Sequence, residues 1–205
     1  KFNSTTVTAG NYTLVSDTQI KANVPAGAAS GKISVTTPAG TGTSVSDFTV
    51  LIPPTITSFS PANGAQGSNV VITGTGFTSI TSVKFNEVEA GAGNFTVNSA
   101  TQITAKVPAS ATSGKIKVTN TLGTATSVNT FYVTPFISTI NPTVGSSGAT
   151  VTISGTNLES ATVKFNSTSV TPATNTATTI TVLVPNGISG AVNVTVVNAG
   201  GTSNA

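Results

Sequence analysis

A phrase of three residues, Lys-Phe-Asn, occurs three times in the chain, and its spacing sets the strongest limit on the fold. It begins at Lys1, Lys84 and Lys164, so the copies lie 83 and 80 positions apart. The segment ITSFSPANGAQGSNVVITGTGF, from Ile56, returns as ISTINPTVGSSGATVTISGTNL, from Ile137, after 81 positions. A period of about 80 residues matches one small domain and is too long for an ankyrin or leucine-rich unit. We therefore predict a tandem array of similar domains.

Within each period the residues are typical of β-strands. Short runs such as VVITG, SVKFN and GKIKVTN alternate apolar with polar residues, and clusters of Gly, Pro and Asn separate them. In GKIKVTN we expect Ile116 and Val118 to face one side of the strand, with Lys115, Lys117 and Thr119 on the other. No segment keeps a helical period. About seven strands in 80 residues without helices predict an all-β sandwich of two sheets.

The order of motifs within a repeat resembles a known family. The pattern is P-x-I-x-x-x-x-P-x-x-G-x-x-G-x-x-V-x-I-x-G-x-G/N-F/L, followed by V-K-F-N and later by T-x-I-x-x-x-V-P and G-x-(I/V)-x-V. It resembles the IPT/TIG domain, an immunoglobulin-like module shared by plexins, some transcription factors and many bacterial surface proteins. The resemblance covers the entire chain and implies β-sandwiches without a disulfide. Asn157 stands where the middle repeat has Gly76, and both residue types tolerate the left-handed backbone conformation.

Aligned in this way, the three repeats differ in completeness. Residues 1–52 are expected to form a partial repeat that lacks the N-terminal strands, because no counterpart of residues 53–83 precedes them. Residues 53–133 form a complete repeat, and residues 134–205 form one without its last strand. Two interpretations are open. The sequence is a window from a longer tandem chain, or neighbouring copies complete each other by strand donation in a head-to-tail polymer.

Composition argues against most catalytic chemistry. The chain has no Cys, His, Met or Trp, its eight basic residues are all Lys, and only 6% of its residues are charged. The usual zinc ligands, thiol nucleophiles and imidazole bases are therefore missing, and we expect neither an enzyme nor a cofactor. Without Arg, and with the Lys residues spread over separate repeats, the net charge of +3 does not predict nucleic-acid binding. The sequence contains no run of about 18 apolar residues, so we predict no membrane span in this segment.

Two acidic residues form the weak candidate for a metal site. Glu87 and Glu89 are expected two apart on one strand, so that their side chains point the same way. Paired carboxylates can hold a hard cation or cleave a glycoside. Ser or Thr occupies these positions in the other repeats, and no calcium-loop pattern surrounds the pair. The alternative is that both residues belong to a solvated face.

Two aromatic residues stand apart from the rest. Most aromatic positions recur between repeats as expected for core residues, whereas Tyr132 and Phe136 align with Thr49 and Thr55. They flank the junction between the middle and last repeats. We predict that they form an inter-repeat contact, and ordinary exposure or a platform for a ligand are the alternatives.

The joints between repeats suggest a structural role. Almost no spacer separates them, and Pro53, Pro54 and Pro135 stiffen the connections. Thr, Ser and Asn cover the surface where charges would be usual, so little self-repulsion opposes packing between copies. We predict a non-catalytic protein outside the cell or on its surface, forming a stalk, adhesin shaft or surface filament. Its partners would be neighbouring repeats or other copies. The alternative is a glycan-binding or spacer module of a polysaccharide-capturing surface protein.

Overall fold

A computed structural model describes residues 1–205 and consists of strands, turns and loops without any α-helix. The prediction of an all-β fold is confirmed. The chain divides into two compact units, Lys1–Ile52 and Pro53–Ala205. The first unit is called the first repeat below, and the second unit contains the middle repeat (53–133) and the third repeat (134–205).

No helix in the structure could cross a membrane.

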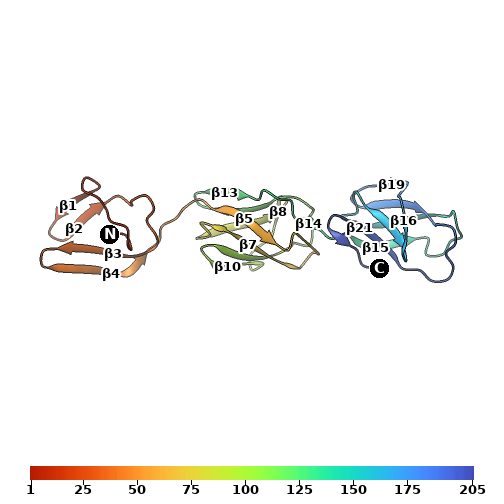
Figure 1. The fold of residues 1–205 in the computed structure, drawn as a ribbon, viewed down its shortest axis with the longest axis horizontal. Helices are drawn as coiled ribbons and strands as arrows, with labels where there is room; N and C mark the ends of the chain where they lie inside the picture. The colour runs from red at the N-terminus through yellow and green to blue at the C-terminus, as the bar shows by residue number, and fades with distance from the viewer. The chain divides into compact units, whose positions relative to one another are not determined.

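The middle repeat is a sandwich of two four-stranded sheets (Figure 1). One sheet has the order β10-β11-β7-β5 and the other β13-β12-β8-β9. All neighbours within these sheets are antiparallel. The strands of the first sheet are β5 (Thr55–Ser60), β7 (Asn69–Thr75), β10 (Phe95–Ser99) and β11 (Gln102–Lys106). Those of the second are β8 (Ile80–Phe85), β9 (Val88–Glu89), β12 (Ile116–Asn120) and β13 (Gly123–Thr126).

A short parallel pair joins the beginning and the end of the middle repeat. The strand β14 (Tyr132–Val133) runs parallel to β6 (Asn63–Gly64). Backbone hydrogen bonds from Tyr132 N to the Ala62 oxygen (3.1 Å) and from Thr134 N to the Gly64 oxygen (3.0 Å) hold it in place. The last strand therefore leaves the repeat next to the segment that follows the first strand.

The third repeat has the same two-sheet arrangement. Its sheets have the orders β15-β16-β20-β19 and β18-β17-β21-β22, which correspond to those of the middle repeat. The strands of the first sheet are β15 (Phe136–Asn141), β16 (Thr150–Thr156), β19 (Thr174–Asn175) and β20 (Thr179–Leu183). Those of the second are β17 (Thr162–Phe165), β18 (Thr168–Val170), β21 (Val194–Asn198) and β22 (Gly201–Thr202).

The first repeat consists of two separate hairpins (Figure 1). β1 (Tyr12–Ser16) pairs with β2 (Gln19–Ala22), and β3 (Gly31–Thr37) pairs with β4 (Gly40–Phe48). These strands correspond to β10 to β13 of the middle repeat. Side chains whose counterparts pack into the core of the middle repeat are exposed here, among them Tyr12, Ile20 and Val35. In the middle repeat, β7 and β8 pair with β11 and β12 and extend the equivalent hairpins into four-stranded sheets.

Strand alternation produces the core of each complete repeat. In β12, Ile116 and Val118 are fully buried, while Lys117 and Thr119 retain contact with solvent, as the sequence predicts. Phe131 is 1% exposed and packs edge-on against Phe85 and Phe59, with ring centroids 5.2 and 6.1 Å apart. Buried aromatic pairs in this geometry add stability beyond the area they bury. Aliphatic and aromatic packing therefore holds the sandwich together without any disulfide.

The glycine that ends each V-x-I-x-G motif lies where two strands approach closely. A Cβ on Gly74 would lie 1.8 Å from the Thr55 carbonyl oxygen, and one on Gly155 would lie 2.0 Å from that of Phe136. In both repeats the register of the neighbouring strand shifts at this point, between Ile56 and Ser58 in the middle repeat. Only Gly fits so close a backbone approach at a bulge.

We expect Phe131→Ala to destabilise the middle repeat by about 3–5 kcal/mol, because it leaves a cavity among Phe59, Phe85 and the aliphatic core. The matched control is Phe48→Ala at the equivalent position of the first repeat, where the ring is 37% exposed and has less packing to lose. Hydrogen exchange of the β12 and β3 amides in the full chain measures each loss separately. Equal losses in the two variants would contradict this account of the core.

Candidate functional site

The two acidic residues of the weak metal candidate do not lie on one strand. Asn86 and Glu87, with φ of 45° and 42°, form the two-residue turn between β8 and β9, and only Glu89 belongs to a strand. The prediction that both extend from one strand was wrong. Two successive residues with positive φ are the signature of a tight hairpin, and Asn tolerates that conformation well. The turn signal was missed because Glu rarely occupies such a position.

The partners of the two carboxylates also differ. Glu87 Oε1 forms an ion pair with Lys117 Nζ at 2.5 Å. Glu89 accepts hydrogen bonds from Ser82 Oγ (2.7 Å) and from the backbone N–H of Val83 (3.2 Å). Each carboxylate therefore has local partners of its own. The structure contains no group of three or more acidic, His or Cys side chains placed to bind a metal.

Tyr132 and Phe136 are both accessible to solvent. They keep 40% and 51% of their surface exposed, and they lie on successive strands, β14 and β15, on either side of the junction between the middle and third repeats. The polar contacts of that junction come from other residues. The proposal that this pair contacts a neighbouring repeat or a ligand therefore rests on its exposed rings and its position.

The carbonyl of Gly200 is the centre of the junction between the middle and third repeats. It accepts hydrogen bonds from Thr134 Oγ1 (2.9 Å) and from Asn63 Nδ2 (3.2 Å). A Cβ on Gly200 would lie 2.2 Å from the Val133 carbonyl oxygen, so the two backbones touch here. Sequence reasoning missed these residues, since small and polar side chains at a domain end give no periodic signal.

A second contact crosses the same junction at the turn after β16. Asn157 has a φ of 55°, and its counterpart Gly76 has a φ of 71°, so the expected left-handed conformation is confirmed at both. The Asn157 side chain is 4% exposed and donates a hydrogen bond from Nδ2 to the Ala111 oxygen (3.3 Å) of the middle repeat. The residue that replaces glycine thus adds an inter-repeat contact.

A repeated asparagine fixes this turn within each sandwich. Asn120 Nδ2 donates to the Gly76 oxygen (3.3 Å), and Asn198 Nδ2 donates to the Asn157 oxygen (2.8 Å). Both asparagines end the central strand of their sheet, β12 or β21. The side-chain amide, buried in Asn120 and half-buried in Asn198, therefore supplies a donor for a carbonyl that no strand partner reaches, as backbone groups away from solvent require.

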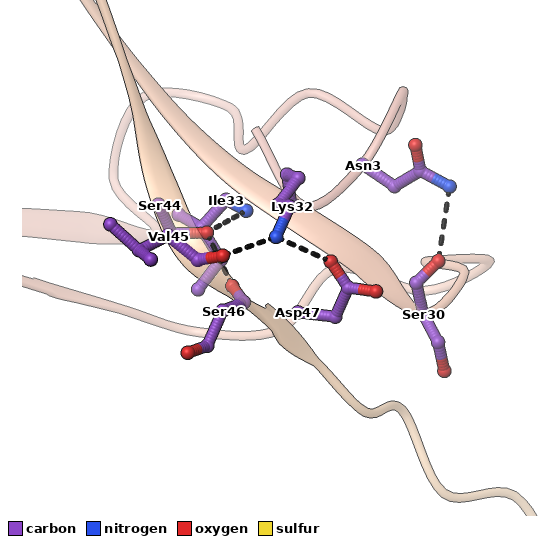
Figure 2. A network of polar contacts seen from close by, with 8 residues as sticks. All are labelled: Asn3, Ser30, Lys32, Ile33, Ser44, Val45, Ser46 and Asp47. Atoms are coloured by element: carbon purple, nitrogen blue, oxygen red, sulfur yellow. Dashed lines mark hydrogen bonds and ion pairs between the residues drawn. The ribbon is translucent and has the colours of Figure 1, made fainter.

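A network of polar contacts in the first repeat surrounds Lys32 (Figure 2). Lys32 Nζ donates to the Val45 oxygen and forms an ion pair with Asp47 Oδ1 at 3.0 Å, as Figure 2 shows. Beside it, Ser44 Oγ accepts from the Ile33 N–H at 3.0 Å. Ser127 Oγ accepts from the Ile116 N–H at the equivalent place in the middle repeat, also at 3.0 Å.

This network has a structural role. A serine recurs at the irregular part of the outer strand in both repeats. Its hydroxyl accepts a hydrogen bond from a backbone N–H that the bulge leaves unpaired. The Lys32–Asp47 ion pair is exposed, and an exposed pair contributes only about 0.2–1 kcal/mol.

The inner face of the first repeat contains a cavity of about 710 Å³. Its apolar lining includes Phe2, Tyr12, Ile20, Val35 and Phe48. In the middle repeat the residues equivalent to these form part of the packed core. The cavity is therefore the uncovered inner face of an incomplete sandwich, and it is not a site where polar groups converge.

We expect the pKa of Glu87 to lie below its usual value, because the Lys117 ammonium donates a hydrogen bond to the carboxylate and also attracts its charge; Lys84 adds a smaller attraction. A carboxyl with a lowered folded-state pKa contributes stability above its unfolded pKa, and this contribution disappears as the pH falls through the folded value. An NMR titration of the side-chain carboxyl would measure the pKa. In Lys117→Ala it should return towards the ordinary value for Glu, and an unchanged pKa would refute the assignment.

Comparisons with known proteins give one family match and several solved structures. The sequence model of the IPT/TIG domain matches residues 54–133 and 135–205. No curated protein matches the chain.

Three solved structures are similar to the chain. The SGBP-B from a complex xyloglucan utilization locus in Bacteroides uniformis is 23% identical, with a TM-score of 0.33, and the match covers 73% of this chain and 47% of that one. The surface glycan-binding protein PbSGBP-B from Prevotella bryantii is 18% identical, with a TM-score of 0.41 and coverage of 74% and 41%. The Plexin A4 extracellular region is 25% identical, with a TM-score of 0.32 and coverage of 70% and 16%. The chain spans less than half the length of these proteins.

The family match extends over the middle and third repeats, which share their sheet orders and their motifs. The chain belongs to the IPT/TIG domain family.

Proposed function

We propose that the chain is a non-catalytic structural protein of the cell surface, in which tandem immunoglobulin-like modules form a stalk, adhesin shaft or surface filament. The observation that carries the proposal is the junction between the middle and third repeats. There the carbonyl of Gly200 accepts hydrogen bonds from Asn63 and from Thr134. Such a junction restricts rotation of one module against the next, as a shaft requires.

The connection between these modules supports the same role. β14 ends at Val133 and β15 begins at Phe136, so two residues connect the sandwiches. One of them, Pro135, has a fixed φ, and the other, Thr134, makes two of the junction hydrogen bonds. A flexible tether would instead be long and rich in Gly and Ser.

The chemistry of the surface is also that of a structural module. The carboxylates with described contacts pair with a lysine, a hydroxyl or a backbone N–H. These contacts neutralise charge or satisfy backbone and hydroxyl groups, which is what a structural surface requires. Contacts of the array would then be made with its own neighbouring repeats and with other copies of the chain.

We expect a narrow distance distribution between spin labels placed on the middle and third repeats. The chain has no Cys, so Leu122→Cys and Leu183→Cys, at two exposed positions, would carry the only labels. Adding Gly200→Ala should broaden the distribution, because the new Cβ would lie 2.2 Å from the Val133 oxygen. Double electron-electron resonance on the full chain measures both.

The matched control is Gly42→Ala, whose Cβ would meet no atom within 4 Å. It should leave the distribution unchanged. A broad distribution in the parent chain would exclude a rigid connection between these modules and, with it, the shaft.

A second candidate function is glycan binding, and the exposed rings of Tyr132 and Phe136 favour it. Aromatic faces stack on the apolar faces of sugar rings, and these two rings are accessible on successive strands. In this alternative the chain is a glycan-binding or spacer module of a polysaccharide-capturing surface protein.

If the alternative is correct, the double variant Tyr132→Ala, Phe136→Ala should lose retention in affinity electrophoresis through a xyloglucan gel. The control is Tyr12→Ala, which removes an equally exposed aromatic ring from a different repeat. Retention of the parent chain and of the control, with loss in the double variant, would support glycan binding. A parent chain that runs unretarded would remove this candidate for that polysaccharide.

A further inference from the structure

Two buried side-chain oxygens of the third repeat have no hydrogen-bond partner. They are Asn157 Oδ1 and Glu159 Oε2, and no other buried side-chain polar atom of the chain shares this condition. Both belong to the turn that follows β16. Leaving a buried polar atom unpaired costs about 1–3 kcal/mol, and more when the group is charged. Two such atoms in three residues single out this turn as the place in the chain where a ligand or an ordered water would supply missing partners.

The position of the Asn157 amide places its free oxygen at the junction between repeats. Its Nδ2 donates to the Ala111 oxygen of the middle repeat at 3.3 Å, and Oδ1 belongs to the same amide group, so it lies within a few ångströms of that carbonyl oxygen. The amide is also nine-tenths buried, which leaves it little freedom to turn towards solvent. An amide oxygen and a backbone carbonyl thus lie near each other, and the Glu159 carboxylate follows two residues later in the same turn.

The side-chain amide that donates to this turn is already occupied. Asn198 Nδ2 donates to the backbone oxygens of Asn157 (2.8 Å) and Glu159 (3.3 Å). The two ion pairs of the structure involve Asp47 and Glu87, so the Glu159 carboxylate has no cationic side chain as a partner. A water molecule could donate two protons, but a region rich in acceptors that includes a net negative charge favours a cation.

We propose that the turn at residues 157–159 and the carbonyl of Ala111 bind a calcium ion at the junction of the middle and third repeats. Ca²⁺ takes six to eight oxygen ligands in flexible geometry and accepts carboxylate, amide and backbone oxygens together with water. Mg²⁺ requires a near-ideal octahedron, and Zn²⁺ prefers nitrogen and sulfur ligands. With one carboxylate in the site, its affinity falls in the weak class, with a dissociation constant of about 10⁻⁴–10⁻³ M.

We assign the site to the third repeat because the equivalent turn of the middle repeat lacks side chains that could bind the ion. Gly76 and Thr78 occupy the positions of Asn157 and Glu159, and neither supplies an amide or carboxylate oxygen. An ion at the third repeat would link its turn to the Ala111 segment of the middle repeat. This inference is independent of whether the array serves as a stalk or binds glycan.

An NMR titration of the EDTA-treated full chain with CaCl₂ tests the proposal. Saturable shifts are expected in the amide signals of residues 109–113 and 155–160, with half-saturation at about 0.1–1 mM. Glu159→Gln keeps the size and shape of the side chain but removes its charge, and it should weaken binding at least about tenfold. Asn157→Gly, which restores the residue of the middle repeat, should weaken it as well.

The matched control is Glu89→Gln, because the Glu89 carboxylate already accepts two hydrogen bonds and lies in another turn. Binding should be unchanged in this variant. Three results would overturn the proposal: no saturable shift at about 10 mM Ca²⁺, equal binding by Glu159→Gln and the parent chain, or shifts centred on residues outside the junction. Amide spectra recorded without Ca²⁺ show that each variant is folded.

Discussion

Packing of one buried face of each sheet against the other is the interaction on which the rest of the structure depends. The chain has no disulfide, and few ion pairs join its strands. The aliphatic side chains of the central strands and a few aromatic rings such as Phe131 therefore hold each sandwich. The turns at the ends of the sandwich add core residues such as Phe77 and Leu158, while neighbouring turn positions differ between repeats. Junction contacts and candidate ligands are found in those turns.

The junction between the middle and third repeats shows how a repeat can gain specificity without losing its fold. Asn120 and Asn198 fix the same turn in both sandwiches, so the backbone path is preserved. The turn residues themselves can then vary, from Gly76 to Asn157, and only the latter has a side chain that reaches a neighbouring module. Junctions between such modules can therefore differ in their contacts while the modules remain alike.

The fold could be predicted from the sequence because its signals are local and repeated. Alternation in GKIKVTN predicts the buried positions of β12, and the family resemblance predicts a sandwich of two sheets. The candidate sites were harder to predict, since they depend on backbone conformation and on contacts between repeats. Glu87 was expected on a strand and lies in a turn with positive φ. Alternation alone also does not predict burial in the first repeat, where Val35 lines the inner cavity and is exposed because each sheet has only two strands.

The parallel pair of β6 and β14 has a consequence for a chain under tension. Pulling on the two ends of the middle repeat draws β14 and the segment containing β6 in opposite directions along their length. The hydrogen bonds from Tyr132 to Ala62 and from Thr134 to Gly64 are then loaded together, in shear, instead of opening one after another like a zipper. A module with this arrangement resists extension most at the onset of stretching, before any core strand separates.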